Sequence, residues 1–138
     1  MILLDIPYKP TPWAAPKLSR NLCYDIREED KRAIRFLIQQ AFVGYNIEPL
    51  DVPVSLEFIF YFEPPSSFST KKKEKYIKYN VPHKVKPDVS NCVKLTEDCL
   101  QKIVITNDSH VVKLTAQKKW SAKSHIFIKI IPFSSLDT

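Results

Sequence analysis

Glycine is nearly absent from this chain, which has one glycine, Gly44, in 138 residues. Loops that wrap phosphate groups in nucleotide-binding folds need several glycines, because their backbone approaches the phosphate closely and adopts unusual dihedral angles. The sequence therefore excludes a Gly-rich phosphate loop, and we expect no nucleotide cofactor.

Long hydrophobic runs and a cysteine framework are also lacking. No apolar run approaches the roughly 20 residues that a membrane-spanning helix needs, and residues 1–16 lack the basic, apolar and small-residue layout of a signal peptide. The three cysteines, Cys23, Cys92 and Cys99, form no C-x-x-C pair, so neither a disulfide set nor a zinc knuckle is indicated. We expect a cytoplasmic protein with a single domain over residues 1–138 and no membrane partner.

Acidic residues are outnumbered by basic ones, 15 to 21, which gives a formal net charge of +6. Much of the excess lies in residues 71–86, where Glu74 is the single acid among seven lysines. The lysines are Lys71, Lys72, Lys73, Lys75, Lys78, Lys84 and Lys86. A lysine run can be a solvated loop and nothing more, but Tyr76 and Tyr79 add aromatic rings that could stack on exposed bases. We expect this segment to bind a nucleic acid backbone.

The hydrophobic pattern predicts strands and helices in the order β-α-β-loop-α-β-β. Strands are expected at residues 1–6, 54–62, 111–120 and 125–131, which alternate or are rich in β-branched and aromatic residues. The order favours an α+β fold in which two helices pack on a mixed, largely antiparallel sheet.

The first expected helix runs from a capping box at Asp25 and Glu28 to Gly44. The second begins at Asp88 or Ser90 and extends to about residue 103. Between them, a short helix could begin at Ser69 or Thr70 within the lysine-rich segment. Residues 7–16 contain four prolines and are expected to be an extended connection.

One sequence motif contains most of the residues that are expected to take part in catalysis. The segment Lys86-Pro87-Asp88-Val89-Ser90-Asn91-Cys92-Val93-Lys94 places a carboxylate, an amide and a cation at the start of the second helix, and Asp108 follows about one short helix later. Acids beside a cationic loop are typical of a protein that holds a divalent metal against a phosphate backbone. Asp88 could be a helix cap and Asp108 a turn residue, but both roles are compatible with metal binding. The motif predicts a metal-dependent nuclease.

The motif belongs to an ordered series of segments. The series comprises residues 6–12, 66–74, 83–94, 98–100 and 107–111. In this order the segments resemble the RusA family of Holliday-junction resolvases. The resemblance implies a small homodimeric endodeoxyribonuclease, often encoded by a prophage, that binds branched DNA and cuts four-way junctions in DNA recombination and repair with Mg²⁺ or Mn²⁺.

By the resemblance, Asp88 and Asp108 would hold the metal, and Lys94 would be the essential lysine. Ser90, Asn91 and Asp98 would lie around these residues, with Asn91 matching the family's asparagine and Asp98 its acid in the middle of the helix. The expected DNA contacts are Lys71, Lys72, Lys73, Lys75, Lys84 and Lys86.

Ser90 is the main departure from the family pattern, which has a second aspartate at this position. Asn107 likewise stands where many relatives carry an acid just before the distal aspartate. Both changes remove negative charge from the expected metal site, although one Mg²⁺ can bind through one or two carboxylates with waters and substrate phosphates. The alternative is therefore a junction-binding protein whose cleavage is weakened or lost.

Two further functions stay open. One is a more general endonuclease that acts on flaps or replication forks. The other is a single-stranded RNA-binding sheet, because Phe58, Phe60 and Phe62 share a face, but the accompanying Gly-rich signature is missing and these rings are more simply core. Trp13 lies in an irregular segment and is the better candidate of the two tryptophans for a DNA contact.

Three charged side chains have competing interpretations. Asp98 or Glu97 could simply pair with Lys94 or Lys102 on the helix surface. His83 is expected to be solvated or partly buried, and its place in the basic loop could allow a phosphate contact.

Overall fold

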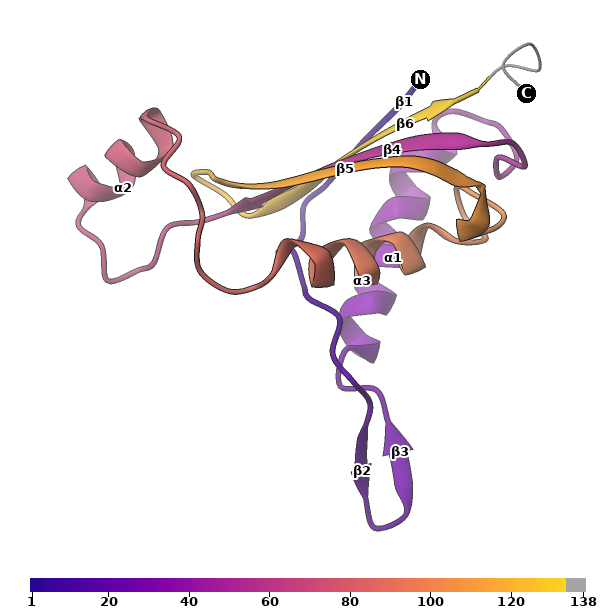
Figure 1. Ribbon diagram of the computed structural model, residues 1–138, viewed down its shortest axis with the longest axis horizontal. Helices are drawn as coiled ribbons and strands as arrows, with labels where there is room; N and C mark the ends of the chain where they lie inside the picture. Colours follow the sequence, from indigo (N-terminus) through magenta and orange to yellow (C-terminus); the bar gives the residue numbers. More distant parts are fainter. Residues whose placement is uncertain (134–138) are drawn as a thin grey trace.

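The computed structural model describes residues 1–133, and a four-stranded sheet lies at its centre (Figure 1). The strands run in the order β1 (Ile2–Ile6), β6 (His125–Pro132), β4 (Val54–Phe62) and β5 (Val111–Trp120). β6 pairs antiparallel with both β1 and β4, whereas β5 pairs parallel with β4. The predicted mixed, largely antiparallel sheet is confirmed.

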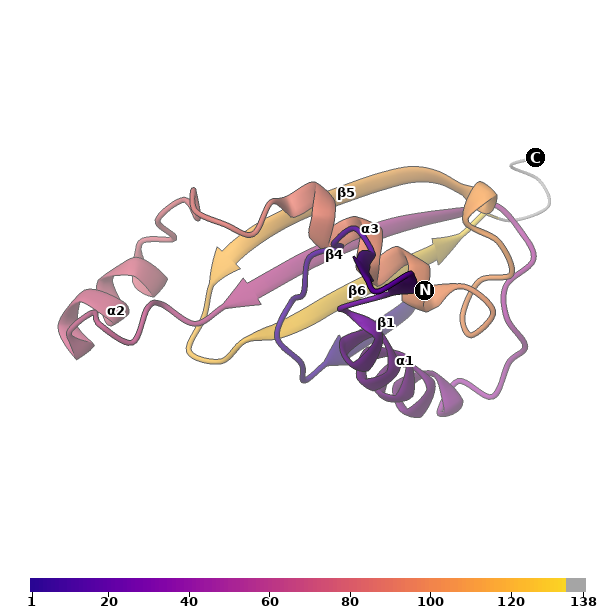
Figure 2. The ribbon, with the colours of Figure 1, turned by 90° about the horizontal axis from the view of Figure 1, so that it is seen from below.

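Helices α1 (Glu28–Val43) and α3 (Val89–Leu100) cover one face of this sheet (Figures 1 and 2). Along β4 every second side chain is buried, as the alternation of the sequence predicts. Phe58 and Phe60 are fully buried in the core, so the face that an RNA-binding platform would need is covered by helices. Within residues 1–133 no helix has both the length and the apolar character needed to span a membrane.

The lysine-rich segment forms a third helix, α2 (Thr70–Lys78), which projects beyond the end of the sheet (Figures 1 and 2). It begins at the predicted cap, where the Ser69 hydroxyl accepts a hydrogen bond from the Lys72 backbone N–H at 3.2 Å. Every side chain of α2 stays at least partly exposed. The short helix expected at Ser69 or Thr70 is therefore present as α2, and the two helices predicted to pack on the sheet are α1 and α3.

A hairpin of β2 (Lys17–Ser19) and β3 (Leu22–Tyr24) projects from the helical side of the molecule (Figure 1). The sequence pattern did not predict it. All of its strand residues are exposed, so no buried face imposes an alternation. Its turn residues, Arg20 and Asn21, both have positive φ angles, of 48° and 68°, which suits a tight hairpin.

Each long helix differs from its prediction at one end, whereas α1 stops at Gly44 and α3 begins after Asp88 as predicted. The capping box is wrong: α1 begins at Glu28, and the Asp25 carboxylate accepts a hydrogen bond from the Arg27 N–H at 2.8 Å while it also binds Lys31. α3 ends at Leu100, three residues early, because the chain turns at Lys102 with a φ of 69°.

Candidate functional site

Helix α3 and the turn before β5 bring four of the six residues expected at or around the metal to one open cavity of about 470 Å³. Asp108 opens a short 3₁₀ helix, η1 (Asp108–His110), which leads into β5. The cavity is lined by Trp13, Lys31, Ser90, Val93, Lys94, Glu97, Asp98, Gln101 and Asp108. Ser90, Lys94 and Glu97 are spaced four and three residues apart and therefore share one face of α3. The structure thus brings Ser90, Lys94, Asp98 and Asp108 together.

Asp88 and Asn91 are not part of this arrangement. Among the described residues 1–133, the cavity lining includes neither of them. Asp88 is the exposed N-cap of α3, two residues before Ser90, and the Asn91 carbonyl accepts a hydrogen bond from the Trp13 N–H at 2.9 Å. A shared ion between Asp88 and Asp108 therefore stays a prediction.

The turn that carries Asp108 is held by its neighbours. The Asn107 side chain accepts a hydrogen bond from the Ser109 N–H at 2.9 Å and so caps η1. The Thr106 hydroxyl donates to Asp51 at 2.8 Å, and the Thr106 N–H donates to the Leu50 carbonyl at 3.0 Å. Asn107 therefore has a structural role in the turn that carries Asp108.

Lys94 lies over the ring of Trp13, with its Nζ 3.5 Å from the ring centre. A cation over an indole face is attracted by the π electrons of the ring. The segment before Trp13 is itself tied down, because the Arg27 Nε donates to the Pro12 carbonyl at 3.0 Å. Trp13 therefore positions the Lys94 ammonium at the rim of the cavity. Whether Trp13 also contacts DNA stays a prediction.

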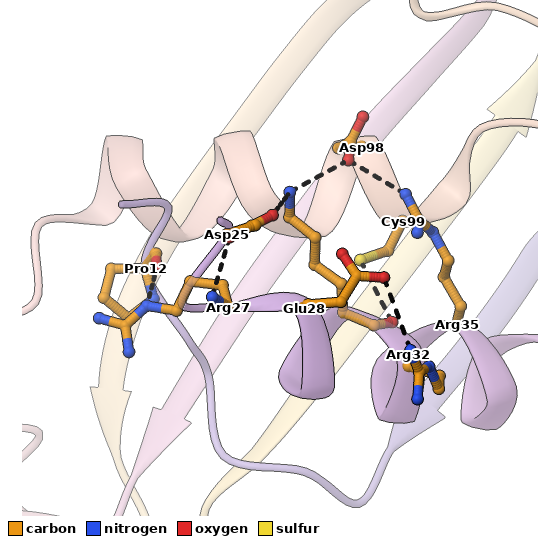
Figure 3. Close-up of polar contacts among 9 residues, drawn as sticks. Pro12, Asp25, Arg27, Glu28, Arg32, Arg35, Asp98 and Cys99 are labelled. Atoms are coloured by element: carbon orange, nitrogen blue, oxygen red, sulfur yellow. Dashed lines mark hydrogen bonds and ion pairs between the residues drawn. The ribbon is translucent and has the colours of Figure 1, made fainter. Parts of the chain in front are cut away.

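Asp98 is neutralised by cations from α1 (Figure 3). Its carboxylate lies 3.2 Å from Arg35 and 3.9 Å from Lys31, whose Nζ also binds Asp25 at 2.7 Å. The hydrogen bond to Asp25 raises the pKa of Lys31, and the same bond lowers the pKa of Asp25. The alternative in which Asp98 pairs with Lys94 or Lys102 on its own helix does not hold, because its partners come from the neighbouring helix and tie α1 to α3.

Glu97 is the site residue that sequence reasoning underrated. It is half-buried, and burial raises the pKa of its carboxyl, with a further rise from the negative charge of Asp108. Within residues 1–133 no basic side chain lies within ion-pairing distance of it. The same residues contain no group of three or more His, Cys, Asp or Glu side chains that could hold a metal alone. An ion in this cavity would need water and substrate oxygens to complete its coordination.

Comparison with known proteins decides the family. The model of the endodeoxyribonuclease RusA family matches residues 7–131, nearly the whole chain. The chain belongs to the RusA family. It is also similar to the uncharacterized protein YqaN of Bacillus subtilis strain 168, with 38% identity over 80 residues. That match spans 56% of this chain and 56% of YqaN, little more than half the length of each.

In this RusA family member the lysine-rich segment forms a basic extension beside the sandwich. Lys71, Lys72 and Lys75 are exposed on α2, and Lys84 and Lys86 are exposed in the loop that leads to α3. The positive charges of this basic extension therefore face solvent, where a polyanion could bind them.

The loop before α3 is held by a lysine that the sequence pattern did not reveal. Lys118 of β5 donates from its Nζ to the carbonyls of Val85 and Pro87, at 2.7 and 2.9 Å. This contact fixes the backbone just before Asp88. No sequence signal marks Lys118, because its partners are backbone atoms about thirty residues away.

Aromatic rings attach α2 to the end of the sheet. Tyr76 packs against Phe68 and Trp120 with ring centres 5.0 and 6.0 Å apart. Tyr79 is 67% exposed, so of the two tyrosines it is the one whose ring is open for stacking on a base.

His83 is buried between Phe62 and Trp120, with ring centres 4.6 and 4.1 Å away, so it is more deeply buried than expected. Burial lowers the pKa of His83 below 6.5, and the nearby positive charge of Lys118 lowers it further. The folded protein therefore takes up the His83 proton at a lower pH than the unfolded chain does.

We expect His83 to make the fold less stable in acid. Between its lowered folded pKa and 6.5, the unfolded state binds more protons at this position, so the unfolding free energy rises with pH and levels off above 6.5. Urea unfolding at pH 5.5 and 7.5 measures the difference, and His83→Gln should reduce it. An unchanged pH difference in the variant would show that other groups cause the dependence.

Proposed function

We propose that this protein is a structure-specific DNA endonuclease that resolves four-way junctions by Mg²⁺- or Mn²⁺-dependent hydrolysis of the phosphodiester backbone. The observation that carries the proposal is the cavity that Asp108, Glu97 and Lys94 line together, in a member of the RusA family. The lysines of α2 and of the loop at residues 84–86 supply a cationic surface for branched DNA.

The chemistry of the donor atoms fits a hard divalent ion. Asp108 and Asp88 offer exposed carboxylate oxygens, and Ser90 offers a hydroxyl at the cavity wall. Oxygen ligands are those that Mg²⁺ and Mn²⁺ prefer. When bound, such an ion lowers the pKa of a coordinated water and neutralises charge that develops on the phosphate.

The side chains around the ion have separate tasks. Lys94, held over Trp13, places a positive charge where the scissile phosphate or the leaving oxygen would lie. Exposed lysines bind the flanking phosphates and set the position of the DNA without reading its sequence. Two symmetric cuts require two related sites, so the proposed active species is a homodimer, acting in the cytoplasm.

A second candidate function rests on Ser90. The position holds a hydroxyl where the family pattern has a carboxylate, and Ser90 lies on the cavity wall. Lysine contacts to phosphate give affinity without a metal. A protein that binds junctions but cuts them weakly or not at all would keep the basic surface and lose the chemistry.

A cleavage assay with a synthetic four-way junction tests the proposal. The purified protein is incubated with the junction, a flap, a fork and a linear duplex, each with Mg²⁺, Mn²⁺ or EDTA. We expect paired nicks in the junction with either metal and none with EDTA. Junction binding without nicks would favour the second candidate, and equal cutting of flaps and forks would indicate a more general endonuclease.

A further inference from the structure

The face of α3 that carries Ser90 also carries an acid seven residues later. Seven residues are close to two helical turns, so Glu97 lies on the same side of the helix as Ser90. Both line the cavity that contains Asp108. The longer glutamate side chain could therefore reach the space that Asp108 faces from η1.

Glu97 and the adjacent Asp98 differ in their surroundings. Asp98 lies within ion-pairing distance of Arg35 and Lys31. Glu97 has no such cation among residues 1–133, although it is half-buried and close enough to Asp108 to interact electrostatically with it. Two carboxylates that line one cavity repel each other when neither forms an ion pair.

We propose that Glu97 is a metal ligand together with Asp108, and that it supplies the carboxylate that the family pattern places at Ser90. The inference rests on the proposed metal-dependent function. It assigns the ion a position farther along α3, away from the N-terminus of that helix and toward η1. A dication between the two acids relieves their repulsion and uses the number of carboxylates that Mg²⁺ commonly takes from a protein. The loss of an acid at position 90 then need not mean a loss of cleavage.

Direct measurement of Mn²⁺ binding tests this assignment without relying on cleavage. The free Mn²⁺ concentration is followed by electron paramagnetic resonance during titration of the wild-type protein, Glu97→Gln and the double variant Ser90→Asp/Glu97→Gln. We expect Glu97→Gln to weaken Mn²⁺ binding by about tenfold or more, as loss of a metal-site residue does. The double variant should regain part of this affinity, because it restores the acid of the family pattern.

Glu48→Gln is the matched control, since it removes an exposed acid that lines a different cavity. It should leave Mn²⁺ affinity unchanged, and circular dichroism checks that every variant is folded. Wild-type affinity in Glu97→Gln, or no Mn²⁺ binding by the wild type, would overturn the assignment. So would a folded double variant that regains no affinity.

Junction cleavage measured on the same samples separates this inference from the proposed function. If the wild type cuts junctions and Glu97→Gln binds Mn²⁺ normally, the assignment of Glu97 is wrong and the nuclease function stands. If Mn²⁺ binding depends on Glu97 but the wild type cuts no substrate, the ligand assignment holds and the nuclease function fails.

Discussion

Asp108→Asn is expected to abolish junction cleavage while junction binding persists. The amide keeps the shape of the side chain but removes the negative charge that would hold the metal. A bound metal is worth several kcal/mol of transition-state stabilisation, so the cleavage rate should fall by about a thousandfold. Single-turnover cleavage of a four-way junction with Mg²⁺ measures the rate, and a gel-shift assay with EDTA measures binding.

The cleavage rate of Asp108→Asn can be attributed to the lost charge, and a control variant is at hand. Asp108 is exposed and its turn is held by Asn107 and Thr106, so the substitution should leave the fold intact. Glu48→Gln again removes one exposed acid, which lines a different cavity, and this variant should cut at the wild-type rate. If Asp108→Asn nicks junctions as fast as Glu48→Gln, the chemistry lies elsewhere on the protein.

The sheet could be predicted because burial imposes a strict pattern on its strands. β4 was predicted at its observed ends, Val54 and Phe62, and its alternate side chains pack beneath the helices. β5 was also predicted at its observed ends, Val111 and Trp120, although its exposed edge follows the alternation less closely. Strong β propensity and turn signals at both ends were sufficient there.

The β2–β3 hairpin shows the limit of the same reasoning. Leu18 and Leu22 are 78% and 70% exposed, so within residues 1–133 these apolar side chains pack on no core that would reveal a period. The capping box predicted at the start of α1 does not form, because contacts of Asp25 within the folded structure replace it. Asp25 satisfies its carboxylate with Lys31 and the Arg27 N–H, and these tertiary and local contacts outcompete the expected capping box.

The site residues that belong to the sequence motif could be predicted from the sequence. Ser90, Lys94 and Asp108 were selected from motif positions, and the fold places all three around one cavity. Trp13 and Glu97 needed the tertiary structure, because Trp13 meets Lys94 from a distant segment and Glu97 shares a cavity with Asp108 only in the folded chain. A seven-residue spacing from Ser90 was the one signal for Glu97 in the sequence.

The triple variant Lys71→Gln, Lys72→Gln and Lys75→Gln should bind four-way junctions less tightly by about one to two orders of magnitude at low salt. Each lysine that no longer neutralises a phosphate lowers the slope of log affinity against log salt concentration by about 0.9. Three such lysines therefore predict a slope smaller by about 2.7. Fluorescence anisotropy with a labelled junction, in EDTA and at several salt concentrations, measures both quantities.

A second triple variant, with Lys17, Lys102 and Lys113 changed to glutamine, removes the same charge from exposed positions outside α2. If the effect arises from net charge alone, both variants will show the same decrease in affinity and the same slope. If α2 contacts the DNA, the α2 variant alone will show the larger change, because counterion release depends on which charges lie against phosphate. Since α2 adds no buried side chain to the core, its loss of charge should leave the unfolding free energy nearly unchanged. A stable α2 variant with wild-type affinity would mean that these lysines are a solvated surface and that branched DNA approaches another face.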